Sequence, residues 1–188
     1  MSNPFYDLYN AMKRSEKEVL ISGSGSTPQG KNEKNRSGQS YLYKRHGMES
    51  EVIKIRLKKK VSGSFLNQAL QTSIKRYPYF NTRLVERDGD FYIIQNAQSL
   101  VARRTKTLAR LGHISCGCHL VDITYYDCSI YVSFHHALCD GRGIMPFVET
   151  LIYYYCNLAY GTEPLPEGVR QADDPLLPGE PDDPFLQK

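Results

Sequence analysis

The sequence predicts an α/β (α+β) sandwich, in which a mixed β-sheet is flanked by helices. Residues 51–57 alternate apolar and polar side chains, as a half-buried strand does. Two pairs of strand-like segments follow, and the clearest helical pattern of the chain lies after residue 143. The resulting order of strand, helix, hairpin, two strands and helix favours a mixed sheet with helices packed on it.

The first predicted helix begins after Ser64, whose side chain is a good N-cap. Pro78 ends it, because the residue before a proline is pushed out of the α region. Its stripe at helical spacing consists of Phe65, Leu66, Ala69, Leu70, Ser73, Ile74 and Tyr77. The segments "TRLVE" and "FYIIQ" follow, and the Asp-Gly of the "RDGD" between them predicts a β-hairpin.

A second strand pair and a long helix complete the ordered part. The strands are "HLVDITYY" and "SIYVSFHH", joined by a turn near Asp127. In the helix, Pro146 is expected in the first turn, where its missing N–H costs little, and Gly161 is a natural stop. The apolar residues at i, i+3, i+4 and i+7 spacing are Ile144, Phe147, Val148, Leu151, Ile152, Tyr155, Leu158 and Ala159.

The sequence divides into four segments. Residues 1–21 have helical spacing, and residues 22–40 contain no large apolar side chain, which predicts a mobile loop. Residues 41–163 hold the predicted lobe. Residues 164–188 are proline-rich and acidic without a period, and are interpreted as an inter-lobe linker or a tail.

Composition restricts the class of protein. The 188 residues fit one domain or one lobe of something larger, and no apolar run approaches the ~18 residues that span a bilayer. Without an export signal, and with an odd count of five cysteines, the chain is expected to be cytoplasmic with reduced thiols and no membrane partner. The basic run "KIRLKKKV" has no interleaved aromatic residues, which disfavours nucleic acid as a partner.

The stretch "FHHALCDGRG", residues 134–143, concentrates the reactive side chains. Strand alternation places His136 on the face of Phe134 and His135 on the opposite face. Asp140 and Gly141 then fall at the strand-to-helix turn, where α/β folds place their chemistry. An imidazole whose ordinary pKa is near 6.5 suits a general base at neutral pH.

The pattern His135-His136-x-x-x-Asp140-Gly141 resembles the HHxxxDG signature of the CoA-dependent acyltransferase superfamily. That superfamily includes chloramphenicol acetyltransferase, the condensation domains of peptide synthetases, and alcohol and plant acyltransferases. "FLNQALQTSIKRYPYFNTRL" (65–84) and "DGDFYIIQ" are similar to its first helix and the following hairpin. The resemblance covers roughly residues 50–165.

The resemblance implies the lobe fold of chloramphenicol acetyltransferase and an enzymatic role. His136 would be the general base that deprotonates the hydroxyl or amine of a small-molecule acceptor. The donor co-substrate would be acyl-CoA or an acyl-pantetheine carrier, without a metal. Asp140 would form a salt bridge with an arginine, for which Arg83 is the first candidate and Arg45 and Arg56 are alternatives. Gly141 would leave space beside the pantetheine arm, and His135 would be structural.

The position of the motif is similar to that in the N-terminal lobe of two-lobed members. The resemblance therefore implies that a second lobe or another subunit completes the site, and it leaves open whether this chain is active alone. The alternative function is a non-catalytic protein-interaction module that retains the acyltransferase fold.

Simpler interpretations of these residues, and one metal-site hypothesis elsewhere in the chain, stay open. His136 could be a satisfied core histidine, and Asp140 a plain N-cap of the following helix. Cys139 could be a nucleophile, although a small buried side chain is the more common role. The zinc ligands suggested by "HISCGCH" would be His113, Cys116, Cys118 and His119, but the C-x-C spacing fits structural zinc poorly.

Overall fold

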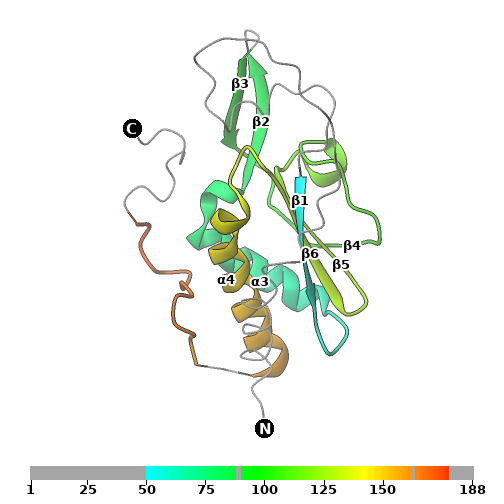
Figure 1. Ribbon diagram of the computed structural model, residues 1–188, viewed down its shortest axis with the longest axis vertical. Coiled ribbons are helices and arrows are strands. Elements are labelled where there is room, and N and C mark those ends of the chain that lie inside the picture. Colours follow the sequence, from blue (N-terminus) through cyan, green and yellow to red (C-terminus); the bar gives the residue numbers. More distant parts are fainter. Residues whose placement is uncertain (1–49, 88–89, 162–163, 178–188) are drawn as a thin grey trace.

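The computed structural model describes residues 50–87, 90–161 and 164–177. It contains one four-stranded sheet, the separate hairpin β2–β3, and the helices α3 and α4, which pack on one another (Figure 1). The elements in chain order are β1 (Ser50–Arg56), α3 (Gly63–Arg76), η1 (Pro78–Phe80), β2 (Thr82–Arg87), β3 (Asp90–Gln95), β4 (Arg103–Arg104), η2 (Ile114–Cys116), β5 (Val121–Tyr126), β6 (Ser129–His135) and α4 (Gly141–Tyr160).

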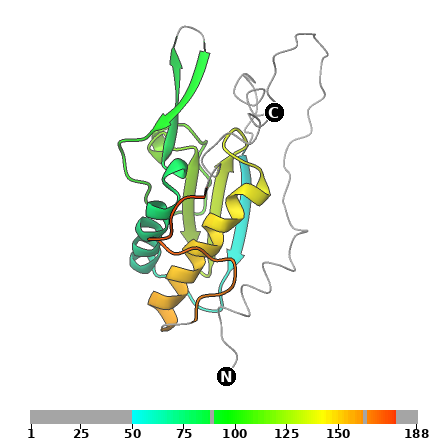
Figure 2. The same cartoon turned by 90° about the vertical axis from the view of Figure 1, so that its left-hand side faces the viewer.

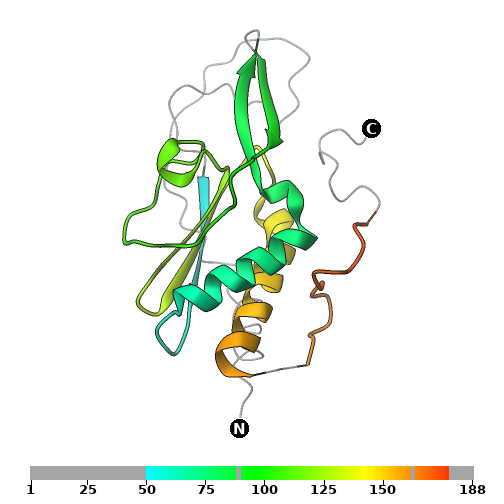
Figure 3. The same ribbon diagram turned by 180° about the vertical axis from the view of Figure 1, so that it is seen from behind.

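The sheet has the strand order β1-β6-β5-β4 and is mixed. Strand β6 is antiparallel to both β1 and β5, whereas β4 runs parallel to β5. The tight turn between β5 and β6 contains Asp127 at φ 50°, a conformation that aspartate tolerates better than most residues. These findings confirm the predicted α+β class, and both helices lie on the same side of the sheet (Figures 2 and 3).

The core lies between the sheet and the two helices. Ile130, Val132 and Phe134 alternate along β6 and are completely buried, as the period of a strand requires. Phe147 and Leu151 of α4 belong to the same buried cluster. Burial of an apolar side chain of this size contributes roughly 1.5–3 kcal/mol each, so this face fixes the end of β6 relative to the start of α4.

Helix α3 begins two residues earlier than predicted. Its N-cap is Ser62, whose hydroxyl accepts a hydrogen bond from the Phe65 N–H, so the expectation of a Ser64 cap was wrong. The backbone N–H of Ser62 also donates to the Tyr155 hydroxyl at 3.0 Å. This contact with α4 holds the start of α3, and Pro78 follows the end of the helix as predicted.

Helix α4 begins at Gly141, with Asp140 as its N-cap, and ends at Gly161 as predicted. Because the helix starts this early, Pro146 lies beyond its first turn, and the expected first-turn position was wrong. A proline there removes one backbone N–H from the helical hydrogen-bond ladder.

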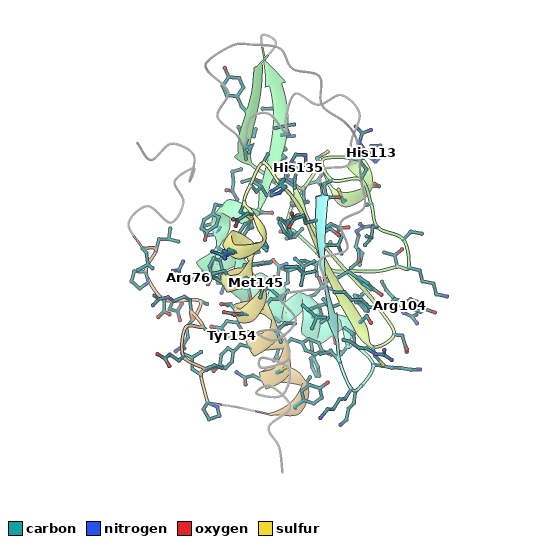
Figure 4. All side chains as sticks on the ribbon, in the orientation of Figure 1. Arg76, Arg104, His113, His135, Met145 and Tyr154 are labelled. Carbon is teal, nitrogen blue, oxygen red and sulfur yellow. The ribbon has the colours of Figure 1, made fainter. Side chains whose placement is uncertain are left out.

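The predicted segments 1–21 and 22–40, and the first residues of the predicted lobe, lie outside the described residues. Residues 164–177 contain no helix or strand, but part of this segment lies along α4 (Figure 1). Val169 is buried against the core, and the Ala172 N–H donates to the Tyr154 hydroxyl at 2.8 Å (Figure 4). Among the described residues, the helices are too short or too polar to cross a membrane.

Candidate active site at the end of β6

His136 lies in the turn that connects β6 to α4. Strand β6 ends at His135 and α4 begins at Gly141, so the turn is short and joins two buried elements. Figure 4 labels His135 at this end of the sheet. The His136 side chain is 29% exposed, which keeps the imidazole in reach of solvent.

Each ring nitrogen of His136 faces an oxygen atom. Nδ1 lies 3.3 Å from the carbonyl oxygen of Cys139, and Nε2 lies 3.2 Å from Oε1 of Glu51. Both oxygens are acceptors when the glutamate is ionised, whereas a neutral imidazole carries a single N–H donor. The contact with Glu51 is an ion pair when the imidazole is protonated.

Glu51 is a site residue that the sequence prediction missed. It pairs with Phe134 across the β1–β6 ladder, two residues before His136. It shares the helix-facing side of β1 with Ile53 and Ile55, because alternate residues of a strand point to the same face. A Cβ added at Gly141 would lie 3.5 Å from Oε2 of Glu51, so the same carboxylate covers both His136 and Gly141.

Asp140 caps α4 rather than pairing with the predicted arginine. Its Oδ1 accepts a hydrogen bond from the Gly143 N–H at 2.7 Å. Arg83 lies in the hairpin β2–β3, where its backbone pairs with Ile94 and forms a bridge to His119. No ion pair between Arg83 and Asp140 is formed in the described part of the chain.

His135 forms one hydrogen bond within the turn and another to the segment before β5. Its Nδ1 accepts a hydrogen bond from the Ala137 N–H at 3.1 Å, and its backbone N–H donates to the Leu120 carbonyl at 2.9 Å. The first bond supports the bend of the chain after β6, and the second joins the strand end to the residue before β5.

Cys139 has the environment of a structural cysteine. Its side chain is buried at 8% exposure, and burial raises the pKa of the thiol to about 12, with smaller contributions from the negative charges of Asp140 and Glu51. A thiol with that pKa is protonated at neutral pH and is a poor nucleophile. A Cβ at Gly143 would lie only 2.8 Å from Cβ of Cys139, so α4 needs a glycine to pack there.

The "HISCGCH" stretch joins the base of the hairpin β2–β3 to the segment before β5. His119 is buried, and its Nδ1 lies 2.9 Å from the Cys116 carbonyl, while its Nε2 lies 2.9 Å from Oδ1 of Asn81. The Cys116 thiol donates to backbone carbonyls, and burial is the main cause of its raised pKa. Within the described ranges, no group of three potential ligands is arranged for a metal ion.

The comparisons with known proteins show similarity in three-dimensional structure but not in sequence. The sequence matches no family model, and no curated protein is significantly similar to it. Two variants of the starter condensation domain of rhizomide synthetase are 13% and 12% identical, with TM-scores of 0.52 and 0.50. The alignments cover 70% of this chain in both cases, and 39% and 38% of those chains.

VibH, an NRPS condensation enzyme, is 17% identical, with a TM-score of 0.47 over 68% of this chain and 35% of that one. The chain thus spans less than two fifths of the length of each of these three structures. At this level of identity the two rhizomide synthetase structures establish the fold only. The described part of the chain has an α+β fold similar to part of these two condensation-domain structures.

Proposed function

We propose that this chain carries the base-bearing part of an acyltransferase, with His136 as general base. The observation that supports the proposal best is the position of the imidazole. It follows the buried strand β6, precedes α4, is partly exposed, and has one nitrogen next to a main-chain carbonyl. The carboxyl ends of strands are where α/β folds tend to place reactive groups.

The reaction follows from this placement. When Nδ1–H donates to the Cys139 carbonyl, Nε2 carries the lone pair and can take the proton of an acceptor hydroxyl or amine. The acceptor oxygen or nitrogen then bonds to the carbonyl carbon of an acyl-CoA or acyl-pantetheine thioester. The C–S bond breaks, and the proton passes from His136 to the departing thiolate. Every step balances without a metal or an oxidant.

Asp140 and Gly141 support this role. The cap formed by Asp140 fixes the turn that carries the imidazole, so Asp140 is a positioning residue. Gly141 has no side chain to fill the space beside His136, and a pantetheine arm could approach there. A small-molecule acceptor is the second substrate.

The proposed substrate tunnel also needs residues from outside this chain. Because the chain spans less than two fifths of the condensation structures, we propose that a second acyltransferase lobe or another subunit completes the substrate tunnel. The base and its turn would then come from this chain, and much of the specificity would come from the other part.

The decisive variant is His136→Ala, assayed in the protein at its full natural length. Acetyl-CoA and longer acyl-CoA donors are offered with panels of alcohols and amines, and the free thiol is measured. Loss of a general base is expected to lower kcat by roughly 10²–10⁴. His113→Ala, at the N-cap of η2, is the matched control, because the His113 side chain is exposed and forms local hydrogen bonds, to Ser115 (Figure 4). Wild-type turnover by His136→Ala would refute the proposed role.

One observation favours a non-catalytic interaction module as the second candidate. The Glu51 carboxylate already lies against Nε2 of His136 and above Gly141. This candidate predicts that no acyl-CoA raises the melting temperature, while a protein partner binds saturably. Stabilisation by an acyl-CoA that depends on Gly141, tested as Gly141→Val, would favour the enzyme instead.

A further inference from the structure

The Glu51 carboxylate bridges the two parts of the motif that a substrate would need. Oε1 lies 3.2 Å from Nε2 of His136, and Oε2 lies over the open side of Gly141, 3.5 Å from a Cβ placed there. Its position is fixed by the pairing of Glu51 with Phe134, because this register brings the start of β1 beside the end of β6. The carboxylate therefore occupies the space in which an acceptor would meet the base.

The carboxylate also affects which ring nitrogen carries the proton. A neutral imidazole donates from one nitrogen, and here it faces an ionised carboxylate at Nε2 and a neutral carbonyl at Nδ1. Hydrogen bonds to ionised acceptors are roughly twice as strong as neutral ones. The Nε2–H tautomer is therefore favoured, and its lone pair lies on Nδ1, against the Cys139 carbonyl.

That tautomer is the wrong one for the chemistry proposed above. The base needs its lone pair on Nε2, the nitrogen that faces Glu51, with the proton on Nδ1. While Glu51 is in place, Nε2 is both covered and protonated. The Glu51 side chain is 29% exposed, and ion pairs with this much exposure are weak, so an incoming group can displace it.

We infer that Glu51 is a positioning residue that acts as a latch on His136. It holds the imidazole as the Nε2–H tautomer and fills the acceptor position until an acceptor displaces the carboxylate. Displacement returns the proton to Nδ1, where the Cys139 carbonyl accepts the hydrogen bond, and frees Nε2 to act as base. The tautomer is a property of the chain alone, and its consequence for turnover rests on the proposed function.

The tautomer can be measured without a substrate. Protein labelled with ¹⁵N in its histidine rings is studied by long-range ¹H–¹⁵N NMR at pH about 8.5, two units above the ordinary histidine pKa. The chain has five histidines, and His136 is assigned as the signal lost in His136→Gln. We expect Nε2–H in the wild type, and a change to Nδ1–H in both Glu51→Ala and Glu51→Gln.

The two Glu51 variants test in different ways whether the carboxylate sets the His136 tautomer. Alanine removes the acceptor, whereas the glutamine amide can donate to an unprotonated Nε2. Asp173→Asn, an exposed carboxylate of the segment 164–177, is the matched control and should leave the tautomer unchanged. An Nδ1–H tautomer in the wild type, or an unchanged Nε2–H tautomer in both Glu51 variants, would overturn the latch.

Turnover then separates a latch from a catalytic partner. If Glu51 competes with the acceptor, Glu51→Ala lowers the acceptor KM without lowering kcat. If Glu51 instead stabilised the protonated imidazole during the reaction, kcat would fall, and the latch would be wrong. Full activity of His136→Ala would refute the proposed function but would leave the tautomer result standing, so the two failures are distinguishable.

Discussion

Replacement of Asp140 by alanine tests whether this residue acts as a helix cap or as a salt-bridge partner. The structure shows one hydrogen bond, from the Gly143 N–H to Oδ1 at 2.7 Å, at the start of α4. Loss of an N-cap side chain costs about 1 kcal/mol, and loss of a negative charge at a helix N-terminus costs about 0.3–1 kcal/mol. We therefore expect Asp140→Ala to lower the free energy of unfolding by about 1.5–2 kcal/mol.

Urea and thermal unfolding measure this effect. For a chain of this length, the loss corresponds to about 3–8 °C in Tm. Asp140→Asn keeps a side-chain oxygen for the cap, so it should lose only the charge contribution of about 0.3–1 kcal/mol. The asparagine variant therefore separates the cap from the charge.

Arg83→Ala completes a double-mutant cycle with Asp140→Ala. Because the two side chains form no ion pair, their effects should add within about 0.5 kcal/mol. A coupling energy of 1 kcal/mol or more between the two positions would show that the salt bridge exists in solution. An asparagine variant as unstable as the alanine variant would likewise contradict the cap.

Three further predictions concern buried polar groups. Burial raises the pKa of the Cys139 thiol from 9.0 to about 12. The buried, protonated thiol therefore makes its full contribution to the free energy of unfolding below pH 9. That contribution is lost as the pH rises toward 12, and labelling of Cys139 by a thiol reagent should stay slow up to about pH 10. Asn67→Ala should lower the free energy of unfolding, measured in urea, by about 1–3 kcal/mol. The reason is that Oδ1 of Asn67 accepts a hydrogen bond from the Ala102 N–H at 2.8 Å, and this bond joins α3 to the segment before β4. Asp122→Ala should lower the free energy of unfolding by a similar amount, because it removes the buried carboxylate that bonds Arg103 at 2.7 Å. An unfolding midpoint equal to wild type would contradict the prediction for either variant.

The repeating patterns of the sequence predicted the elements well. The alternation in residues 51–57 corresponds to β1, and the apolar stripe after residue 143 corresponds to α4. Strands β2 and β3 pair as the hairpin predicted from the "RDGD" stretch. In each case the signal is a property of neighbouring residues, because the period of a helix or strand is local.

The missed features depend on contacts between distant parts of the chain. Ser62 caps α3, and its backbone N–H donates to the hydroxyl of Tyr155, which lies 93 residues away in the sequence. Alternation alone places Glu51 on the apolar face of β1, which is a usable signal. Its contact with His136 requires β1 to lie beside β6, and no local pattern contains that pairing.

The spacing of the motif has a physical reason in this structure. Three residues separate His136 from Asp140, and the last of them, Cys139, supplies the carbonyl that faces Nδ1. The Cys139 side chain is buried beneath the start of α4, beside Gly143, and Asp140 caps the helix from the next position. The ring, the carbonyl and the cap therefore lie within one short turn, and one residue more or fewer would take the carbonyl away from the imidazole. A variant that weakens the cap should accordingly displace the His136 ring as well as destabilise α4, so the stability of the helix and the orientation of the imidazole are coupled through Cys139.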